Sequence, residues 1–205
     1  MITNITDIIA AILLGYSLGS IPFGLLLMRL TGRGDLRAIG SGNIGATNVL
    51  RSGNKVLAAL TLVLDLLKGY AAVWLSTRLL SCHEVIAAAG AFFGHLYPIW
   101  LKFKGGKGVA TYAGILLGLF WQGGVVYAVA WTGALIIFRI SSVAGLCAAI
   151  AAPVAALYFG RIDLVAILTV CSMIVFWKHR ENIERLLNGT EPKVGATKSS
   201  GSGTK

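Results

Sequence analysis

Apolar residues fill most of this chain in long runs that are separated by short clusters of glycine, polar and basic residues. A helix needs about 20 predominantly apolar residues to cross the hydrocarbon core of a bilayer. The pattern therefore predicts an all-α, polytopic membrane protein. The runs that carry this prediction are Ile8–Met28, Lys55–Arg78, Val85–Leu101, Gly108–Phe138, Ile140–Gly160 and Ile162–Trp177.

The run Gly108–Phe138 has no charged residue and is too long for one crossing. As a single helix it would measure about 46 Å at 1.5 Å per residue, against a hydrocarbon core of about 30 Å. Gln122, Gly123 and Gly124 predict a break that divides it into two shorter helices. Hydropathy alone leaves one long helix and a helical hairpin both open.

The distribution of positive charge favours the hairpin, which gives seven transmembrane helices with a periplasmic N-terminus and a cytoplasmic C-terminus. Cytoplasmic loops carry an excess of lysine and arginine. With one long helix, Arg139 and the C-terminal basic group would cross to the other side. With the hairpin, 15 of the 18 lysines and arginines lie on the cytoplasmic side: Arg29, Arg33, Arg37, Arg51, Lys55, Lys102, Lys104, Lys107, Arg139, Lys178, Arg180, Arg185, Lys193, Lys198 and Lys205.

Composition agrees with a membrane protein: 56% of residues are hydrophobic, 13% are charged, and the mean hydropathy is +0.78. A soluble domain carries about 25% charged residues. The net charge of +10 is accounted for by orientation and by attraction to anionic lipid or substrate. No basic domain lies outside the membrane, so nucleic-acid binding is not expected. We expect one membrane domain over residues 1–192 and a disordered cytoplasmic tail over 193–205, rich in Gly, Ser, Thr and Lys.

The first polar stretch, Gly40–Arg51, lies between two predicted membrane helices. Glycines let backbone N–H groups approach a ligand closely, and the Arg51 guanidinium suits phosphate. Glycines at positions 40, 42 and 45 match the dinucleotide fingerprint literally, but that motif requires a preceding strand. The stretch therefore predicts a phosphate-binding loop at the membrane surface, with a simple tight turn as the alternative.

Two further polar stretches fall on the same predicted side. Lys104–Gly108 opens a helix, and a helix N-terminus with nearby glycines and a lysine favours an anion; a flexible basic loop is the alternative. Lys178–Arg185 contains His179 and Asn182, which are three residues apart and share a helix face. Their alternative role is structural, at the membrane interface.

Two charges lie inside the second predicted helix. Asp65 and Lys68 are three residues apart, and charges within a membrane are costly and usually paired or functional. We expect an ion pair that faces the bundle, with a direct contribution to the site as the alternative. His83 and His95 are expected to be structural. No metal site is predicted, because the three histidines lack ligand spacing.

The segments GSGNIGATNVLR, GGKGVAT and HRENI resemble, in the same order, the three signature motifs of the bacterial acyl-phosphate:glycerol-3-phosphate acyltransferases, the PlsY family. The likeness extends over residues 5–190. It implies transfer of an acyl group from acyl phosphate to glycerol 3-phosphate, giving lysophosphatidic acid and inorganic phosphate. It also implies a multi-pass protein of the bacterial inner membrane whose active site faces the cytoplasm. We expect no cofactor and see no sign of an obligate protein partner.

The loops and the resemblance together predict the site residues. Arg51, Lys107, His179 and Asn182 are expected to be catalytic. Substrate contacts are expected at Ser41, Gly42, Asn43, Thr47, Asn48, Arg51, Gly105, Gly106, Lys107, Gly108, Ser141, His179 and Asn182, with Ser142 as the alternative to Ser141.

We expect direct transfer without an acyl-enzyme. Acyl phosphate is already activated, and no Ser or Cys stands beside an evident base held by a third group. The competing function is transport of an anionic metabolite. Transporters place polar groups near the bilayer midplane and often contain internal repeats, whereas the polar stretches here gather at one surface.

Overall fold

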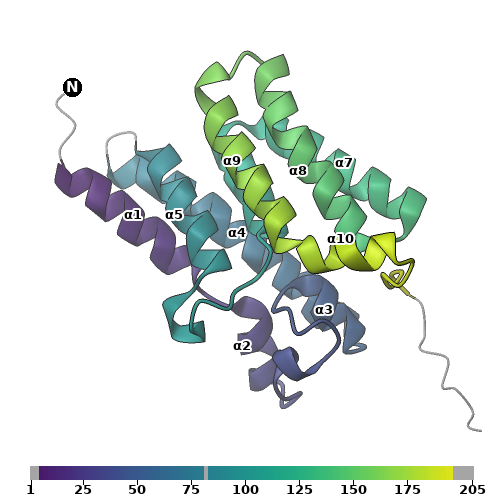
Figure 1. Cartoon of the computed structure of the whole chain (residues 1–205). Coiled ribbons are helices and arrows are strands. Elements are labelled where there is room, and N and C mark those ends of the chain that lie inside the picture. The colour runs from purple at the N-terminus through teal and green to yellow at the C-terminus, as the bar shows by residue number, and fades with distance from the viewer. Residues whose placement is uncertain (1–4, 81–82, 196–205) are drawn as a thin grey trace, which may run out of the picture.

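The computed structural model describes residues 5–80 and 83–195, and within these ranges every regular element is a helix. The elements are labelled in Figure 1. In chain order they are α1 (Ile5–Gly19), α2 (Phe23–Leu30), η1 (Leu36–Ala38), α3 (Ala46–Arg51), α4 (Lys55–Leu79), α5 (Glu84–Leu96), η2 (Ile99–Leu101), α6 (Val109–Leu119), α7 (Trp121–Phe138), α8 (Ser141–Tyr158), α9 (Ile162–Lys178) and α10 (Arg180–Leu187).

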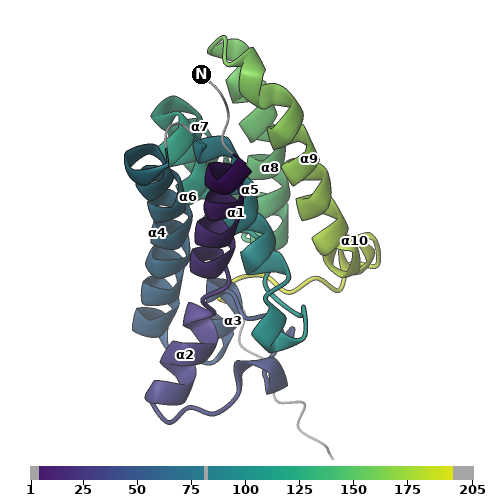
Figure 2. The same cartoon turned by 90° about the vertical axis from the view of Figure 1, so that its left-hand side faces the viewer.

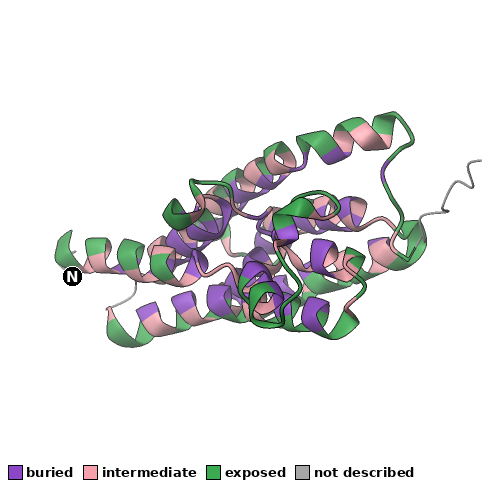
Figure 3. Cartoon of the chain, turned by 90° about the horizontal axis from the view of Figure 1, so that it is seen from below, coloured by how far each residue is buried: buried purple, intermediate pink, exposed green. Residues whose placement is uncertain are grey.

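The long helices form two groups that meet at α6. One group contains α1, α4, α5 and α6, and the other contains α7, α8 and α9, while α6 also contacts α7 and α8. The short elements α2, α3 and α10 gather at one end of the bundle (Figures 1 and 2). Viewed from that end, buried residues line the inner faces of the helices and exposed residues cover the outer faces (Figure 3). The polar loops are therefore brought together at one end of an apolar body.

Glycines allow α1 and α5 to approach closely. A Cβ added to Gly15 or Gly19 of α1 would overlap the backbone of Ala87 or Ala91 in α5. Gly94, on α5, packs in the same way against the backbone of α1. Small residues spaced four apart are typical of closely packed membrane helices. At these positions a larger residue would push α1 and α5 apart.

The predicted helix Ile8–Met28 is interrupted at Ser20–Pro22, which divides it into α1 and α2. Proline lacks an N–H and its ring clashes with the preceding turn, so it disrupts the helical ladder. Two side chains satisfy the carbonyls that this break exposes. The Trp100 indole donates to the Ser20 carbonyl at 2.8 Å, and Lys68 Nζ donates to the Ile21 carbonyl at 2.8 Å.

Other helix ends also differ from the sequence-based expectation. The run Gly108–Phe138 breaks at Phe120, which has extended backbone, and Gly123 and Gly124 lie inside α7. A Cβ on Gly123 would overlap the Phe120 ring, so these glycines serve the tight turn by packing. Helix α5 ends at Leu96 because Tyr97 precedes Pro98, and a residue before proline is disfavoured in helical conformation.

The starts of α4 and α8 are capped differently. Asn54 caps α4, since its side chain accepts a hydrogen bond from the Leu57 N–H. Ser141 and Ser142 do not cap α8. The capping position is Ile140, and no side-chain hydrogen bond caps this helix.

Within the described residues, five segments are long and apolar enough to cross a membrane: Ile5–Leu30, Lys55–Leu79, Glu84–Leu101, Trp121–Phe138 and Ser141–Tyr158. Helices α9 and α10 together would add a sixth, bent by 58°. The apolar helix α6 has 11 residues, about 16 Å, and is shorter than the hydrocarbon core. Most of the tail predicted to be disordered, residues 196–205, lies outside the described residues.

Candidate active site

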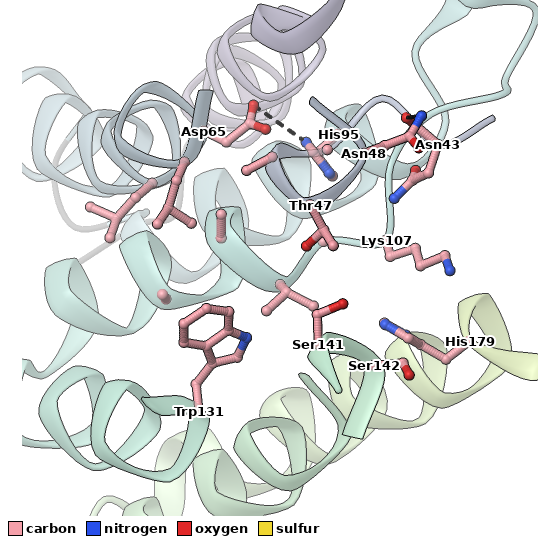
Figure 4. A pocket seen from close by; sticks show the side chains of 18 of the residues that line it. Asn43, Thr47, Asn48, Asp65, His95, Lys107, Trp131, Ser141, Ser142 and His179 are labelled. Atoms are coloured by element: carbon pink, nitrogen blue, oxygen red, sulfur yellow. Dashed lines mark hydrogen bonds and ion pairs between the residues drawn. The ribbon is translucent and has the colours of Figure 1, made fainter. Parts of the chain in front are cut away.

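A cavity of about 300 Å³ lies between α3, α4, α6, α7 and α8. The polar side chains come from loops that are far apart in the sequence, and Figure 4 shows Thr47, Ser141 and His179 around one opening, with Trp131 further along. Ten of the predicted site residues line the cavity: Ser41, Asn43, Thr47, Asn48, Arg51, Lys107, Gly108, Ser141, His179 and Asn182. Gly42, Gly105 and Gly106 do not line it.

Asn48 organises the first loop. Its buried side-chain amide donates to the carbonyls of Leu36, Ile39 and Asn43 at 3.0, 2.9 and 2.8 Å. Its Oδ1 accepts the Ser41 N–H at 3.1 Å. Both polar ends of this side chain are thus engaged by the loop itself.

The first loop does not present a row of free glycine N–H groups, contrary to the expectation of a glycine nest. The Gly42 N–H donates to the Ile39 carbonyl at 3.0 Å, and the Ser41 N–H is taken by Asn48. Gly40 and Gly42 have φ of 56° and 68°, a region that glycine adopts without strain. These glycines shape the loop around Asn48.

The second loop corrects the same expectation for Gly105 and Gly106. Their N–H groups donate to the carbonyls of Leu96 and His95 at 3.1 and 3.0 Å, which fixes this loop on the end of α5. Neither N–H is therefore available to a ligand. Gly108 has φ of 87°, in the left-handed region, and starts α6 at the edge of the cavity.

Three helix N-termini meet at the cavity. Gly45–Thr47 at the start of α3, Gly108–Ala110 at the start of α6, and Ser141–Ser142 at the start of α8 all line it. The first N–H groups of a helix lack intrahelical partners, and the helix dipole places partial positive charge there. The cavity is therefore suited to anionic groups such as phosphate.

Two side-chain cations add to this potential. Arg51 is exposed at the rim, packs its stem beside Gly40, and forms no ion pair with any described residue. Lys107 lies between the loops and donates to Asn182 Oδ1. Burial, followed by the nearby Arg185, lowers the pKa of Lys107 to about 8. Lys107 is therefore still mostly cationic at neutral pH.

Glu191 joins α8, α10 and the chain that follows α10. Its Oε1 accepts hydrogen bonds from Ser142 Oγ at 2.8 Å and from Asn182 Nδ2 at 2.6 Å. Its Oε2 accepts from Arg185 Nε at 2.7 Å. Burial alone would raise the pKa of Glu191, but the hydrogen bonds from Asn182, Arg185 and Ser142 outweigh it and hold the pKa below its usual value.

The sequence-based prediction missed Glu191. The residue follows the last motif and sits beside Pro192 at the start of the tail, so its role depends on the turn that Gly189 makes after α10. Gly189 has φ of 68°, and the Glu191 N–H returns to the Arg185 carbonyl at 3.2 Å. An isolated acidic residue close to a cationic motif was the one available signal.

The protonation of His179 follows from its contact with α9. Its Nδ1 lies 2.8 Å from the Val175 carbonyl oxygen, which accepts hydrogen bonds and cannot donate them. Nδ1 therefore carries the proton, and Nε2 is left as an acceptor. Burial, together with Lys107, lowers the pKa of His179 to about 4, so the ring is neutral at pH 7.

The structure distinguishes the two adjacent serines. Ser142 is buried and its hydroxyl is bonded to Glu191, whereas the less buried Ser141 lies beside the opening (Figure 4). A carboxylate held by Asn182 and Arg185 is a poor base, so Ser142 is not arranged as an activated nucleophile. Among the described residues there is no cluster of three or more His, Cys, Asp or Glu side chains that would hold a metal ion.

The other end of the cavity is apolar and runs between α4 and α7 with α6 at its base. Leu62 and Leu66 come from α4, Ala113 comes from α6, and Ala128 and Trp131 come from α7. Small side chains on α6 leave room beside the larger leucine and tryptophan side chains. The cavity therefore joins a cationic polar end to an apolar end that lies within the membrane-spanning body.

Residues 9–189 match the family model for glycerol-3-phosphate acyltransferase. The chain belongs to the glycerol-3-phosphate acyltransferase family. A relative of that name from Erythrobacter litoralis is 59% identical over 192 residues, which cover 94% of this chain and 97% of the relative. Another, from Brucella ovis, is 56% identical over 189 residues, covering 92% and 94% of the two chains.

Solved acyltransferase structures share the fold. The chain superposes on PlsY (YgiH), described as an integral membrane glycerol 3-phosphate acyltransferase, in its glycerol 3-phosphate form, with a TM-score of 0.86 and 34% identity. The match covers 92% of this chain and 96% of that one. The lysophosphatidic acid form of the same protein matches with a TM-score of 0.83 at 32% identity, covering 91% and 94%.

Proposed function

We propose that this protein transfers an acyl group from acyl phosphate to a hydroxyl of glycerol 3-phosphate, releasing lysophosphatidic acid and inorganic phosphate. The observation that carries the proposal is the meeting of three helix N-termini, Lys107 and Arg51 at a cavity whose other end is apolar. Both substrates carry phosphate, and one carries a long apolar chain. Family membership and the ligands named for the solved acyltransferase support the same reaction.

In this proposal the two cations hold the two phosphates. Arg51 binds one phosphate at the rim, together with the start of α3 and the Ser41 and Thr47 hydroxyls. Lys107 binds the phosphate of the acyl donor, beside the N-termini of α6 and α8. Losing one preorganised donor to developing negative charge typically costs about 2.7–4 kcal/mol of transition-state stabilisation.

His179 positions the glycerol hydroxyl. Because Nδ1 donates to Val175, Nε2 accepts a hydrogen bond from the hydroxyl and aims its oxygen at the acyl carbon. The new C–O bond forms as the bond between the acyl carbon and the phosphate oxygen breaks. The hydroxyl proton, first bonded to His179 Nε2, turns to a phosphate oxygen and leaves with the departing phosphate. Holding the two reactants in this geometry contributes about 7–11 kcal/mol.

The sequence-based list of substrate contacts is revised in this proposal. Ser41, Asn43, Thr47, Arg51, Lys107, Ser141 and His179 contact the substrates. Asn48, Gly42, Gly105 and Gly106 support the loops instead, because their polar groups are engaged within the protein. Asn182 accepts a hydrogen bond from Lys107 and holds it in place, and Asn182 is itself held by its hydrogen bond to Glu191.

The proposed topology has seven crossings, with α6 and α7 as a hairpin, the N-terminus in the periplasm and the C-terminus in the cytoplasm of a bacterial inner membrane. Arg29, Arg33, Arg37 and Arg51 lie on the segments at the end of the bundle that carries α2, α3 and α10. Arg78 and Arg161 lie near the ends of α4 and α9 that point away from it. The excess of positive charge at the site end supports a cytoplasmic active site.

A product assay on the purified protein tests the proposed function. Given acyl phosphate and glycerol 3-phosphate in detergent or lipid, the protein should form lysophosphatidic acid and phosphate in equal amounts. Arg51→Ala should lower this turnover at least a hundredfold while the protein still elutes as a folded species. Movement of glycerol 3-phosphate across vesicles without any chemical product would instead identify a transporter.

A further inference from the structure

A buried charged cluster lies directly below the second loop. Lys68 Nζ is 2.6 Å from Asp65 Oδ1, and the two residues are 4% and 3% exposed. This confirms the expected ion pair facing the bundle. Lys68 also donates to the Ile21 carbonyl at the break between α1 and α2, so its position is fixed on a separate element.

His95 joins this ion pair to the second loop. Its Nδ1 faces Asp65 Oδ1 at 3.8 Å, a contact drawn as a dashed line in Figure 4 that is longer than a hydrogen bond. On its other side, the imidazole packs against Gly106, because a Cβ added there would overlap Nε2. The His95 carbonyl accepts the Gly106 N–H at 3.0 Å. His95 thus contacts Gly106 through both its ring and its backbone.

The cluster is placed where it would affect the site. Asp65 and His95 both line the cavity, and Lys107 immediately follows Gly106. Intramembrane charges are costly, and those that persist are usually paired and functional. An apolar contact could fill the same space without that cost.

We propose that Asp65 and His95 are positioning residues, which hold Gly106 from below and so set the place of Lys107 at the phosphate of the acyl donor. Lys68, held by the Ile21 carbonyl, fixes Asp65; Asp65 contacts one edge of the His95 ring; the other edge of the ring supports Gly106. The inference rests on the proposed function, since it concerns how Lys107 is placed for that reaction.

Paired substitutions at Gly106 and His95 test the contact between ring and loop. Gly106→Ala should lower kcat/KM at least tenfold, because the new Cβ meets the His95 ring. Adding His95→Ala removes the obstacle, so the double variant should recover at least threefold over Gly106→Ala. If the fold-loss of kcat/KM in the double variant equals the product of the losses in the two single variants, the His95 ring does not position the loop and the proposal is wrong.

Gly105→Ala provides the matched control. Its Cβ would overlap the backbone carbonyl of His95, which no side-chain substitution removes. Adding His95→Ala to Gly105→Ala should therefore not raise kcat/KM above that of Gly105→Ala alone. If His95→Ala restored kcat/KM equally in the Gly105→Ala and Gly106→Ala variants, it would act by loosening the whole loop. That result would also contradict the proposal.

A second experiment separates positioning from a merely structural role. The pair Asp65→Asn/Lys68→Met removes the ion pair without leaving an unpaired charge. We expect the KM for acyl phosphate to rise at least fivefold in the fraction that is folded. A structural cluster would lower the amount of active protein and leave KM unchanged, which would overturn the proposal.

His83→Gln, at the opposite end of α5, is the control for changing a histidine on this helix and should leave KM unchanged. The wild-type measurement keeps the two claims apart. If the wild-type protein forms no lysophosphatidic acid, the proposed function fails; if it does and the variants behave additively with unchanged KM, this inference alone fails.

Discussion

At the scale of single residues, Lys107 makes the site sensitive to pH. The pKa of about 8 in the free protein means that the lysine loses its proton as the pH rises through that value. The kcat/KM for acyl phosphate, which reports the free enzyme, should fall about tenfold per pH unit above it. In Lys107→Arg the guanidinium stays charged to beyond pH 12, so this alkaline decline should disappear even if the maximal rate is lower. An identical decline in both proteins would assign it to another group.

Asn48 is expected to be essential although its polar groups face the loop. Asn48→Ala removes the side chain that bonds Leu36, Ile39, Ser41 and Asn43, and it leaves the Asn43 carbonyl and the Ser41 N–H without their partners, at about 1–3 kcal/mol each. Turnover should fall at least a hundredfold as the Gly40–Arg51 loop loosens. Asn54→Ala, which removes the cap of α4 at a cost of about 1 kcal/mol, is the control and should keep most of the activity. Near-normal turnover by Asn48→Ala would contradict this role.

The sequence indicated which residues surround the cavity better than what each one does. Serine, threonine, asparagine and arginine in a glycine-rich stretch predict polar contacts, but they do not say whether a donor faces a ligand or its own loop. Asn48 faces the loop, and the Gly105 and Gly106 N–H groups face α5. These assignments depend on where η1 and the end of α5 lie, which local sequence does not encode.

At the scale of elements, the turn after α10 connects α10 to α8 through the side chain of Glu191. Glu191 holds α8 through Ser142 and α10 through Asn182 and Arg185. Glu191→Ala leaves the buried Ser142 hydroxyl and the Asn182 Nδ2 group without their acceptor, at about 1–3 kcal/mol each. We expect a lower unfolding temperature in detergent and at least a tenfold loss of kcat/KM, since Asn182 also holds Lys107.

Glu184→Ala is the control for that substitution. Glu184 is exposed on α10, the helix that precedes Glu191, and its side chain has no hydrogen bond or ion pair to another described residue. Its removal should change neither the unfolding temperature nor turnover. If Glu191→Ala behaves like Glu184→Ala, the hydrogen bonds of Glu191 do not contribute to the site.

Apolar run length predicted that helices exist but placed their ends less well. The break in Gly108–Phe138 was expected at Gln122–Gly124 and falls at Phe120, because the two glycines are needed for packing under the turn. The helix is interrupted between α1 and α2 at Pro22, and Lys68 and Trp100 supply donors to the exposed carbonyls. Both outcomes depend on contacts between segments distant in sequence.

At the scale of the whole molecule, the proposed topology makes α6 and α7 a transmembrane hairpin, which would decide the side of the membrane on which everything after it lies. Alkaline phosphatase folds with its disulfides in the periplasm and not in the cytoplasm. A fusion after Gly160 should therefore be active, and fusions after Phe103 or at the C-terminus should be inactive. If residues 108–138 crossed the membrane once, the result after Gly160 and at the C-terminus would be reversed.

The central claim is that the acyl group moves directly from acyl phosphate to glycerol 3-phosphate. The most direct measurement is rapid quenching of the purified protein with radiolabelled acyl phosphate, with and without glycerol 3-phosphate. The account predicts label in lysophosphatidic acid when glycerol 3-phosphate is present, and no label bound to protein in either case. Covalently labelled protein that forms without glycerol 3-phosphate and passes its label to it on addition would contradict the account.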